Sequence, residues 1–374
     1  MITVKEATTT SELKKFVKFP FTIYKGSPYW VPPIIKDELA TFDKEKNPVF
    51  KDAEARFFLA YKDNTIVGRI ATIVNWIEVK EQKTKKMRFG WFDFIDDVEV
   101  SEALLKKVEE IGLGHKMEFM EGPVGFSNLD KVGVLTEGFD HIGTMITWYN
   151  HPYYANHYER LDFVKEKEYM ENKFPFENVK PKFFLRVCNL IKKRYGLKEV
   201  NFTKTKDVMP MANEMFDLFN ASYASLSSFV TINAIQKEYF KKKYISFINP
   251  EYIKFVVDKE DKLVAFCIVM PSFSKALQKA NGKLFPFGLF HMLNARKNSK
   301  DVTFYLIGVH PDYQNKGVTA ILFNQCYETF KAKGIETCIR TPELEENIAI
   351  RQLWKHFDPV IHKRRRTYRK ELSA

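Results

Sequence analysis

The chain has 374 residues, 45% hydrophobic and 28% charged, which is typical of a globular protein and enough for two ordinary domains. No run approaches the roughly 20 apolar residues that a membrane span requires, and the N-terminus lacks the apolar centre of a signal peptide. The formal net charge of +12 suits an acidic ligand, a membrane surface or a nucleic acid. We expect a cytoplasmic protein without a membrane span.

The first half of the chain predicts alternating strands and helices. Its expected elements, in chain order, are strand 2–7, helix 11–19, hairpin 57–75, strand 88–95, helix 101–115, strand 117–124 and a helical region at 153–163. Ser101 is the expected N-cap of the helix that begins there. Four carboxylates precede or enter that helix, and we favour capping and solvation over a metal or amine site for Asp93, Asp96, Asp97 and Glu99.

The second half repeats the same plan after a connecting helix at 181–195. Its expected elements are strand 199–205, helix 207–219, hairpin 253–272, strand 302–309, helix 317–333, strand 336–341 and helix 347–357. Because the order recurs, we expect two tandem α+β domains with one common plan. The expected domains are residues 1–172 and 173–374.

A glycine-bearing stretch, Glu121–Asp140, interrupts the plan of the first half. Four glycines in twenty residues predict a long structured loop, and such loops on a rigid scaffold often carry function. An inert surface loop is the alternative. The residues that we expect to line a substrate pocket from this loop and the segment after it are Asn128, Asp130, Tyr149 and Asn150.

Two further segments stand out in the second half. Lys283–Asn298 is apolar and then basic, which is compatible with a lid over an acyl chain, a membrane-surface helix or a clasp against the first domain. We favour the clasp. The basic run His362–Lys370 alternates as a solvent-facing edge strand does, and a phosphate or nucleic-acid patch is the alternative.

The cysteines, histidines and short motifs exclude several chemistries. The four cysteines and eight histidines show no metal-ligand spacing, so we expect no metal site. Cys267, Cys326 and Cys338 lie in apolar runs, which predicts that they are buried. No Walker loop, His-Glu-x-x-His or Gly-x-Ser-x-Gly motif occurs, which excludes hydrolase and metalloenzyme functions of those classes.

The stretch Leu306–Phe323 joins a strand to a helix through a polar loop that contains one glycine, Gly317. A helix N-terminus carries about half a positive charge and up to about four unpaired N–H groups. Such groups bind phosphate when they converge, and a glycine allows a ligand to approach closely. The loop is therefore compatible with a pyrophosphate cradle, and a plain strand-to-helix turn is the alternative.

Residues 309–319, V-H-P-D-Y-Q-N-K-G-V-T, resemble the acetyl-CoA binding motif of the GCN5-related N-acetyltransferase (GNAT) superfamily, written Gln/Arg-x-x-Gly-x-Gly/Ala. Gln314 and Gly317 match the motif, Val309 and Pro311 match its lead-in, and Thr319 departs from it. The resemblance implies two tandem GNAT-like domains, each a mostly antiparallel mixed sheet flanked by helices. The first domain lacks the loop, so we expect it to have lost CoA binding.

The resemblance also assigns roles to residues of the second half. In this superfamily the pantetheine arm of CoA lies along the strand before the loop, and an asparagine near the start of the next helix often contacts the cofactor. The residues so assigned to acetyl-CoA or another acyl-CoA are Ile307, Gly308, Val309, Gln314, Asn315, Lys316, Gly317, Val318, Thr319 and Asn347.

The family's usual general-acid tyrosine falls on Trp354, whose indole cannot release a proton at useful cost. Another group must then protonate the leaving thiolate, or the site does not catalyse the usual reaction. The titratable groups nearby are His310, Tyr313, Tyr305 and Glu343, and Tyr305 and Glu343 are our catalytic candidates.

Three functions are compatible with these features. The first is an acyl-CoA-dependent N-acyltransferase, in which a small-molecule or peptide amine directly attacks the thioester of acetyl-CoA or another acyl-CoA in a ternary complex. The second is a sensor that binds CoA or another anion without turnover. The third is transfer from aminoacyl-tRNA, as in the tandem peptidoglycan-bridge transferases that share this fold. The basic surplus suits tRNA, but residues 314–319 favour CoA and the first function.

Overall fold

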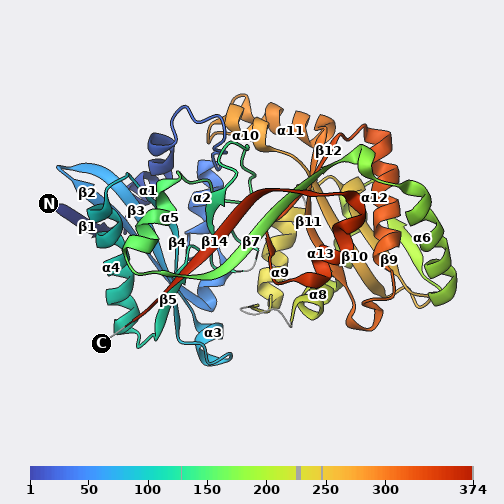
Figure 1. Cartoon of the computed structure of the whole chain (residues 1–374), viewed down its shortest axis with the longest axis horizontal. Helices are drawn as coiled ribbons and strands as arrows, with labels where there is room; N and C mark the ends of the chain where they lie inside the picture. Colours follow the sequence, from blue (N-terminus) through green and yellow to red (C-terminus); the bar gives the residue numbers. More distant parts are fainter. Residues whose placement is uncertain (128, 225–228, 246, 373–374) are drawn as a thin grey trace.

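The computed structural model describes residues 1–127, 129–224, 229–245 and 247–372, except the side chains of residues 183 and 349. Within these ranges, fourteen strands form one continuous mixed sheet with helices on its faces (Figure 1). The strands are β1 (Ile2–Glu6), β2 (Ala53–Lys62), β3 (Thr65–Asn75), β4 (Lys86–Phe94), β5 (Phe119–Gly122), β6 (Val134–Glu137), β7 (Val164–Pro175), β8 (Lys198–Asn201), β9 (Ile253–Val257), β10 (Leu263–Pro271), β11 (Asp301–Val309), β12 (Thr337–Arg340), β13 (Glu343–Leu344) and β14 (Val360–Glu371).

The helices occupy the connections that the sequence pattern predicts, with several short additions. They are α1 (Thr10–Ile23), α2 (Ile35–Thr41), α3 (Trp76–Lys80), α4 (Val98–Gly114), α5 (Tyr153–Arg160), α6 (Pro181–Tyr195), α7 (Thr205–Val208), α8 (Ala212–Tyr223), α9 (Ala234–Phe240), α10 (Ser274–Ala280), α11 (Gly288–Asn298), α12 (Thr319–Lys333) and α13 (Ile348–Trp354). Among the described residues, none of the helices combines the length and apolar composition that crossing a bilayer requires.

The two halves of the sheet exchange strands at their junction. The strand order is β1-β2-β3-β4-β5-β14-β7-β12-β11-β10-β9-β8, with β6 paired to β14 and β13 paired to β7. The last strand, β14, thus pairs with β5 of the first half, and β7 pairs with β12 of the second half. Figure 1 shows β7 and β14 crossing the middle of the molecule together. The predicted tandem α+β fold is confirmed, with its two mixed sheets joined into one. The domain limits at residues 172 and 173 remain a prediction.

The position of β14 corrects our prediction of a solvated edge strand. The strand lies inside the sheet, and it buries Arg365 and Lys363, each of which is 1% exposed. Both cations pair with Glu171 of β7, because a buried charge needs a partner. Arg364 and Arg366 also have glutamate partners, so this alternation reflects paired charges on both faces.

Local sequence signals explain most element ends. Both predicted hairpins are present as β2–β3 and β9–β10, and Asp63 and Asn64 turn the first with positive φ angles of 50° and 62°. The prediction of Ser101 as an N-cap is wrong, since α4 begins at Val98 and is capped by the side chain of Asp97. An earlier acceptor was available to the first N–H groups, so the helix extends one turn further.

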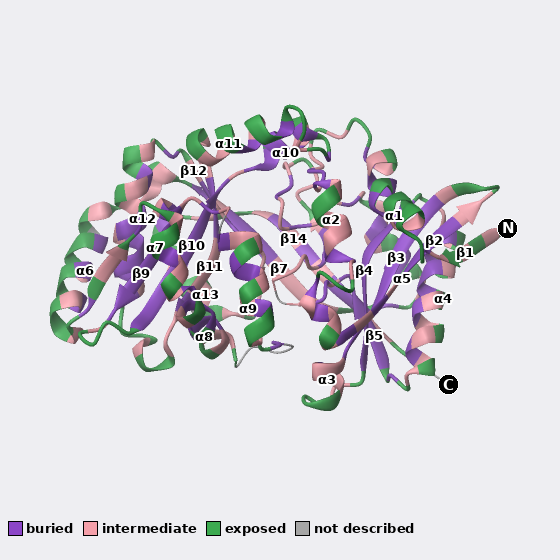
Figure 2. Cartoon of the chain, turned by 180° about the vertical axis from the view of Figure 1, so that it is seen from behind, coloured by how far each residue is buried: buried purple, intermediate pink, exposed green. Residues whose placement is uncertain are grey.

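The second half has a hydrophobic core on each face of its sheet. One core, which includes Phe304 and Trp354, lies under α6 and α12, and the other, which includes Phe255, lies under α8 and α9. Figure 2 shows buried strands between helices whose outer faces are exposed. Cys267, Cys326 and Cys338 are buried, as predicted.

The segment that contains α10 and α11 clasps the first half, as we favoured. Its buried side packs Met292 and Leu277 against Val31 and Ile34. The side-chain amide of Gln278 donates to the backbone carbonyls of residues 28 and 30, at 2.8 and 3.0 Å. The outer side of the same segment is exposed to solvent.

Candidate functional site

The strands β11 and β12 separate after a short parallel ladder. They pair only from Asp301 with Thr337 to Phe304 with Arg340. The chain then continues into β13, which pairs with β7 instead. In the described part of the chain, residues 305–309 therefore have no strand on this side of β11. A separation of this kind leaves a strand edge with backbone groups that a ligand can reach.

Two hydroxyl groups from the end of α8 reach this free edge. The Tyr223 hydroxyl donates to the carbonyl oxygen of Ile307 at 2.9 Å, and the Ser222 hydroxyl donates to that of Val309 at 3.0 Å. Both side chains are half-buried. Burial raises the pKa of Tyr223 to about 12, so its hydroxyl stays protonated at neutral pH. Sequence reasoning did not find these residues, because they lie more than 80 positions from β11 and match no motif.

The loop after β11 leaves donors free at the start of α12. The N–H groups of Gln314 and Lys316 bond within the turn, to carbonyls of residues 310 and 313 at 3.1 and 3.3 Å. Within the residues that the structure describes, four other N–H groups have no protein acceptor: those of Asn315, Gly317, Val318 and Thr319. The residue before α12 offers no side-chain cap. The predicted run of backbone donors is thus available to a ligand.

Backbone conformation explains why this loop needs its glycine. Asn315 and Gly317 have positive φ angles of 59° and 76°, the left-handed conformation from which anion-binding turns are built. Gly317 is exposed, and a Cβ there would lie 3.4 Å from Ile191 of α6. The ammonium group of Lys316 lies 5.5 Å from the ring centres of Tyr195 and Tyr313, which keeps one cation beside the free amides.

The other residues that the sequence assigned to the cofactor have defined structural surroundings. A Cβ at Gly308 would lie 2.3 Å from the Phe266 ring, so the glycine is required for sheet packing. The side chain of Gln314 donates to the carbonyl of Val309 at 3.3 Å. Asn347 caps α13 by accepting from the N–H of Ile350 at 3.2 Å. These interactions fix the loop and the strand that the motif predicts.

Residues 212–357 match the model of the acetyltransferase (GNAT) family, and the match includes the free loop and the open edge of β11. These residues form a domain of the GNAT family. In fold, the whole chain is similar to a tandem GNAT protein from the clavulanic acid biosynthesis pathway, with a TM-score of 0.60, 12% identity and coverage of 100% of this chain and 99% of that one. It is also similar to a GCN5-related N-acetyltransferase from Sphaerobacter thermophilus, with a TM-score of 0.51, 10% identity and coverage of 100% and 96%.

Two sequence relatives cover most of this chain. Protein YghO of Escherichia coli (strain K12) is 23% identical over 373 residues, which cover 97% of this chain and 93% of that protein. Bacterial ceramide synthase of Caulobacter vibrioides (strain NA1000 / CB15N) is 22% identical over 312 residues, which cover 82% of this chain and 80% of that protein.

At the position where the GNAT family usually has a tyrosine, this chain has Trp354, which packs in the hydrophobic core. Trp354 is 1% exposed and lies against Phe304 and Phe323, with ring centres 4.8 and 4.9 Å away. The guanidinium of Arg340 lies 4.7 Å from the centre of its indole ring. Arg340 also binds the carboxylate of Glu343 through two nitrogens, so Glu343 already has a strong partner.

Tyr305 lies on the opposite face of β11, where the two halves of the chain meet. Its hydroxyl is 3.5 Å from the carbonyl oxygen of Leu129, in the loop of the first half. The next residue in that loop, Asp130, accepts from the N–H and hydroxyl of Ser127 at 2.8 and 3.1 Å. Gly125 makes room for this carboxylate, since a Cβ there would lie 2.3 Å from that of Asp130.

The acid–base properties of this junction follow from burial. Burial raises the pKa of Asp130, although Lys243, the hydrogen bonds from Ser127 and Arg88 act in the opposite direction. Burial also raises the pKa of Tyr305, and the charge of Asp130 adds to the rise. A carboxylate whose pKa is raised accepts a proton more readily than an ordinary one.

The remaining substrate candidates have structural partners or lie outside the description. Asn128 lies outside the described residues. Asn150 is buried and holds β6, since its side chain accepts from the N–H of Leu135 at 2.7 Å and donates to that residue's carbonyl at 3.0 Å. The Tyr149 hydroxyl donates to the carbonyl of Phe139 at 3.2 Å.

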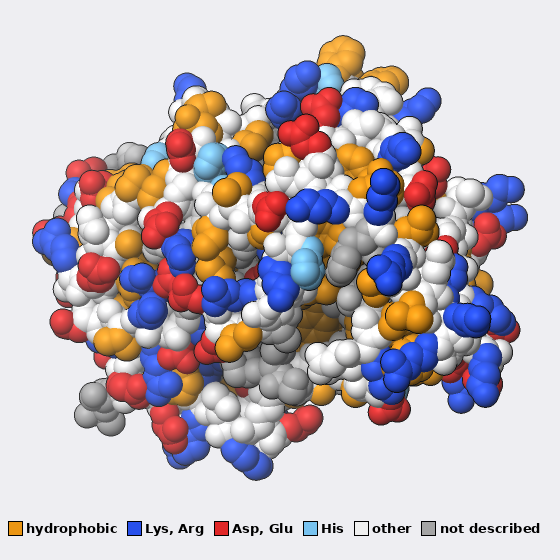
Figure 3. All heavy atoms as spheres, turned by 45° about the vertical axis from the view of Figure 1, so that its right-hand side comes forward, with side chains coloured by type: hydrophobic (Ala, Val, Ile, Leu, Met, Phe, Trp, Pro, Cys, Tyr) orange, Lys and Arg blue, Asp and Glu red, His pale blue; other side chains and the backbone are white. Residues whose placement is uncertain are grey.

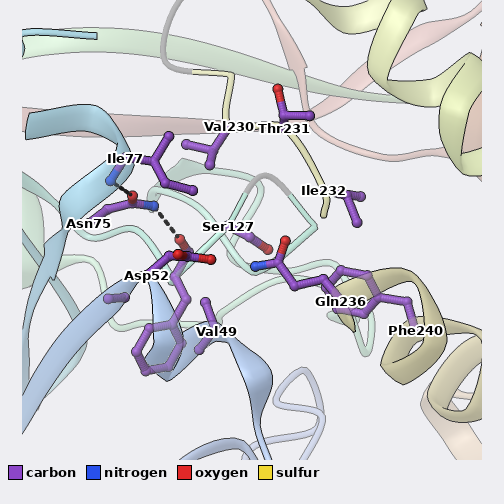
Figure 4. A pocket seen from close by; sticks show the side chains of 12 residues that line it. Val49, Asp52, Asn75, Ile77, Ser127, Val230, Thr231, Ile232, Gln236 and Phe240 are labelled. Carbon is purple, nitrogen blue, oxygen red and sulfur yellow. Dashed lines mark hydrogen bonds between the residues drawn. The ribbon is translucent and has the colours of Figure 1, made fainter. Parts of the chain in front are cut away.

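A pocket lies beside this junction, between the two halves. Asp52, Asn75 and Ser127 line it from the first half, and Thr231 and Gln236 face them from the second half (Figure 4). Its empty space is about 310 Å³, including the part that opens to solvent. Because Ser127 also binds Asp130, one loop connects the pocket wall to the face of Tyr305.

The aspartates of the first half are engaged in ion pairs and hydrogen bonds. Asp93 is buried and accepts from Arg69 and the Tyr24 hydroxyl at 2.8 and 2.7 Å. Asp96 pairs with a histidine of α5, and Asp97 pairs with a lysine of β2. Among the described side chains, no group of three histidine, cysteine or carboxylate residues is arranged to hold a metal ion.

Proposed function

We propose that the protein is an acyl-CoA-dependent N-acyltransferase whose cofactor site lies in the second half. The observation that carries this proposal is the set of free N–H groups at residues 315 and 317–319, next to the open edge of β11. A diphosphate fits such donors, and the edge fits a pantetheine amide. Acyl-CoA would supply the activated acyl group as a thioester.

The proposed reaction is a direct attack of an amine on the thioester carbonyl carbon. A C–N bond forms while the C–S bond breaks, the amine proton goes to a base, and the thiolate takes a proton from an acid. We assign the base to Asp130, because burial raises its pKa and so makes it a stronger proton acceptor than an exposed carboxylate, and because its loop borders β11. Tyr305 shares this face of β11.

We assign the acid to Tyr223. Its hydroxyl lies at Ile307, on the strand edge that would carry the thioester end of the cofactor, and its pKa of about 12 keeps it protonated. This role takes the place of the tyrosine that the family has at the position of Trp354. Glu343 receives no proton-transfer role in this scheme, because Arg340 binds it.

The acceptor is an amine that enters between the two halves. The pocket at Asp52 and Gln236 supports this route, because its walls come from both halves and meet the loop of Asp130. One relative is named bacterial ceramide synthase, and a ceramide is an N-acylated long-chain amino alcohol. We therefore include long-chain amino alcohols among the acceptors to be tested.

The test combines calorimetry with a thiol-release assay. We expect CoA, acetyl-CoA and longer acyl-CoAs to bind the purified protein, and at least one amine from a panel of small amines, peptides and long-chain amino alcohols to release free thiol. Binding without thiol release across the panel would support the CoA sensor, which the buried Trp354 favours. Absence of CoA binding would overturn both, and salt-sensitive tRNA binding would then support aminoacyl transfer.

A further inference from the structure

The outer side of α11 and of the turn before it carries large apolar side chains that are exposed to solvent. Phe285, Phe287 and Phe290 are 76%, 70% and 69% exposed, and Leu293 of the same helix is 48% exposed. We call these four residues the phenylalanine face. Isolated exposed apolar residues are ordinary, but three exposed phenylalanines within six positions mark an interaction surface.

The phenylalanine face is held rigidly, so its exposure follows from the fold. The inner side of the segment packs Met292 and Leu277 into the cluster with Val31 and Ile34 of the first half. The carbonyl of Gly282 accepts from the N–H of Ile35 at 3.0 Å, and Ser274 donates to the carbonyl of Gly143 at 2.8 Å. The segment therefore presents its outer side at the periphery of the molecule, where Figure 1 shows α10 and α11.

The charged residues of the segment that carries this face all have one sign. Residues 272–300 contain no Asp or Glu, and their cations are Lys275, Lys279, Lys283, Arg296, Lys297 and Lys300. Within the described residues, none of these six cations is in an ion pair, although Arg296 and Lys300 donate to backbone carbonyls. Figure 3 shows hydrophobic side chains at the top of the molecule, with lysine and arginine side chains beside them and some carboxylate side chains just below.

We propose that the phenylalanine face docks the protein on the surface of an anionic phospholipid bilayer. Apolar rings on α11 and the turn before it, with six cations and no carboxylate in the same segment, match an interface whose acyl boundary lies beneath anionic headgroups. A nucleic acid would match the cations and leave the phenylalanines exposed to water. A protein partner would have to supply an apolar pocket with carboxylates around its rim. A bilayer supplies both the apolar and the anionic component at once.

This docking does not depend on the proposed acyl transfer, and vesicle sedimentation tests it without any activity. The probes are vesicles of phosphatidylcholine alone and vesicles that also contain phosphatidylglycerol, each at low and high salt. We expect the full chain to bind the phosphatidylglycerol vesicles, with weaker binding at high salt and to the neutral vesicles. Sedimentation of the protein with neither kind of vesicle would overturn the proposal.

Variants separate the apolar from the electrostatic component. Phe287→Ser combined with Phe290→Ser should lower the partition into phosphatidylglycerol vesicles by at least about tenfold, and Lys297→Gln by about fivefold. The matched control is Leu190→Ser on α6, where the leucine is 62% exposed, and its partition should equal that of the wild type. All of these side chains are exposed, so thermal unfolding should confirm intact folds.

A spectroscopic readout locates the contact. A tryptophan at position 287, introduced as Phe287→Trp, should shift its fluorescence to the blue and be quenched by brominated phospholipids, relative to the wild type. Unchanged partition of the double serine variant, or an unquenched tryptophan at position 287, would contradict docking through this face. Without vesicles, analytical ultracentrifugation compares the molecular masses of the wild type and the double serine variant. A wild-type mass twice that of the variant would assign the face to self-association and overturn the proposal.

Discussion

The two halves of the molecule use the same order of elements but end their central strands differently. In the first half, β4 runs into α4 through residues 95–97, and the Asp97 carboxylate accepts from the first turn of the helix. In the second half, β11 runs into α12 through a longer loop that leaves four N–H groups free. A negative charge already occupies the anion-binding end of α4, whereas the same end of α12 is open to a ligand.

The edge of the central strand also differs between the halves: it is covered in β4 of the first half and free in β11 of the second half. After β5, residues 122–124 continue along β4, and the N–H of Val124 donates to the carbonyl of Phe89 at 2.8 Å. Glycines permit this contact, since a Cβ at Gly90 would lie 2.4 Å from the carbonyl oxygen of Val124. After β12, by contrast, the chain leaves β11 and joins β7. In the first half the chain's own backbone therefore covers the edge of β4, whereas in the second half the edge of β11 is free.

The largest expected effect concerns the buried ion pairs beside β4, which hold the loop that covers this strand's edge. Arg88 donates to the carbonyl of Gly125 at 3.0 Å and binds the buried Glu78, which also pairs with Lys86. Glu78→Gln should lower the free energy of unfolding by about 3–5 kcal/mol, because it removes the carboxylate that pairs with the buried Arg88 and one of the two carboxylates that pair with Lys86. Denaturant unfolding at neutral pH measures this, and CoA affinity of the folded variant should be unchanged.

The pH dependence of this effect has a defined sign. Burial opposes ionisation of Glu78, but Arg88 and Lys86 outweigh it and lower the pKa of Glu78 to about 2. The stabilisation is therefore complete above the usual glutamate pKa of 4.5 and is lost as the pH falls from there toward 2. The control is Glu118→Gln, whose exposed pair with Lys85 should contribute less than about 1 kcal/mol. Equal effects at both glutamates would contradict the argument.

The next effect concerns the open loop of the second half. Gly317→Trp should weaken CoA binding at least about 100-fold, since the new side chain covers the free amides and the left-handed backbone disfavours it by about 1–2 kcal/mol. Calorimetry measures the affinity. Gly334→Trp is the matched control, because Gly334 also has a positive φ, 63°, but lies at the far end of α12. If both variants bind CoA equally, the loop is not the diphosphate site.

Much of this comparison could be predicted from the sequence. Alternation, turn residues and the motif around Gly317 predicted the tandem fold, both hairpins and the run of free backbone N–H groups in the loop before α12, because these features depend on neighbouring residues. The prediction for residues 362–370 was wrong for a physical reason. Alternating cations are equally compatible with solvent and with glutamates such as Glu171, which lies almost 200 positions away in the sequence.

The groups that meet at the candidate reaction centre could not be predicted in the same way. Tyr223 reaches Ile307 from the end of another helix, and Leu129, the neighbour of Asp130, reaches Tyr305 from the other half of the chain. Their proximity depends on how α8 and the long loop pack on β11. No spacing rule predicts such contacts, although the glycines at 122 and 125 marked the loop as structured.

Asp130→Asn tests whether a residue of the first half contributes to the proposed reaction at β11 of the second half. We expect kcat for thiol release to fall by at least about 100-fold, because a general base typically contributes this much. In the wild type, activity should decline as the pH falls through the raised pKa of Asp130, and this decline should disappear in the variant. A control, Ser127→Ala, keeps the carboxylate and should retain most activity. An unchanged pH profile in Asp130→Asn would assign the base elsewhere.

Tyr223→Phe removes the proposed proton donor from the free edge of β11. We expect kcat to fall about tenfold with little change in KM for acyl-CoA, since only protonation of the leaving thiolate is lost. Ser222→Ala is the matched control, because it removes the neighbouring hydroxyl at Val309 and should leave kcat near that of the wild type. A larger effect of Ser222→Ala than of Tyr223→Phe would contradict the assignment.

The smallest expected effect comes from the capped helix of the first half. Asp97→Ala removes the N-cap of α4 and the 2.8 Å pair with Lys62, so it should lower the free energy of unfolding by about 1 kcal/mol. The CoA affinity should not change, and no second CoA equivalent should bind, because residues 122–124 still fill the edge of β4. Calorimetric stoichiometry decides this point. A second binding event in Asp97→Ala would mean that the capping carboxylate alone, and not the closed strand edge, separates the two halves in function.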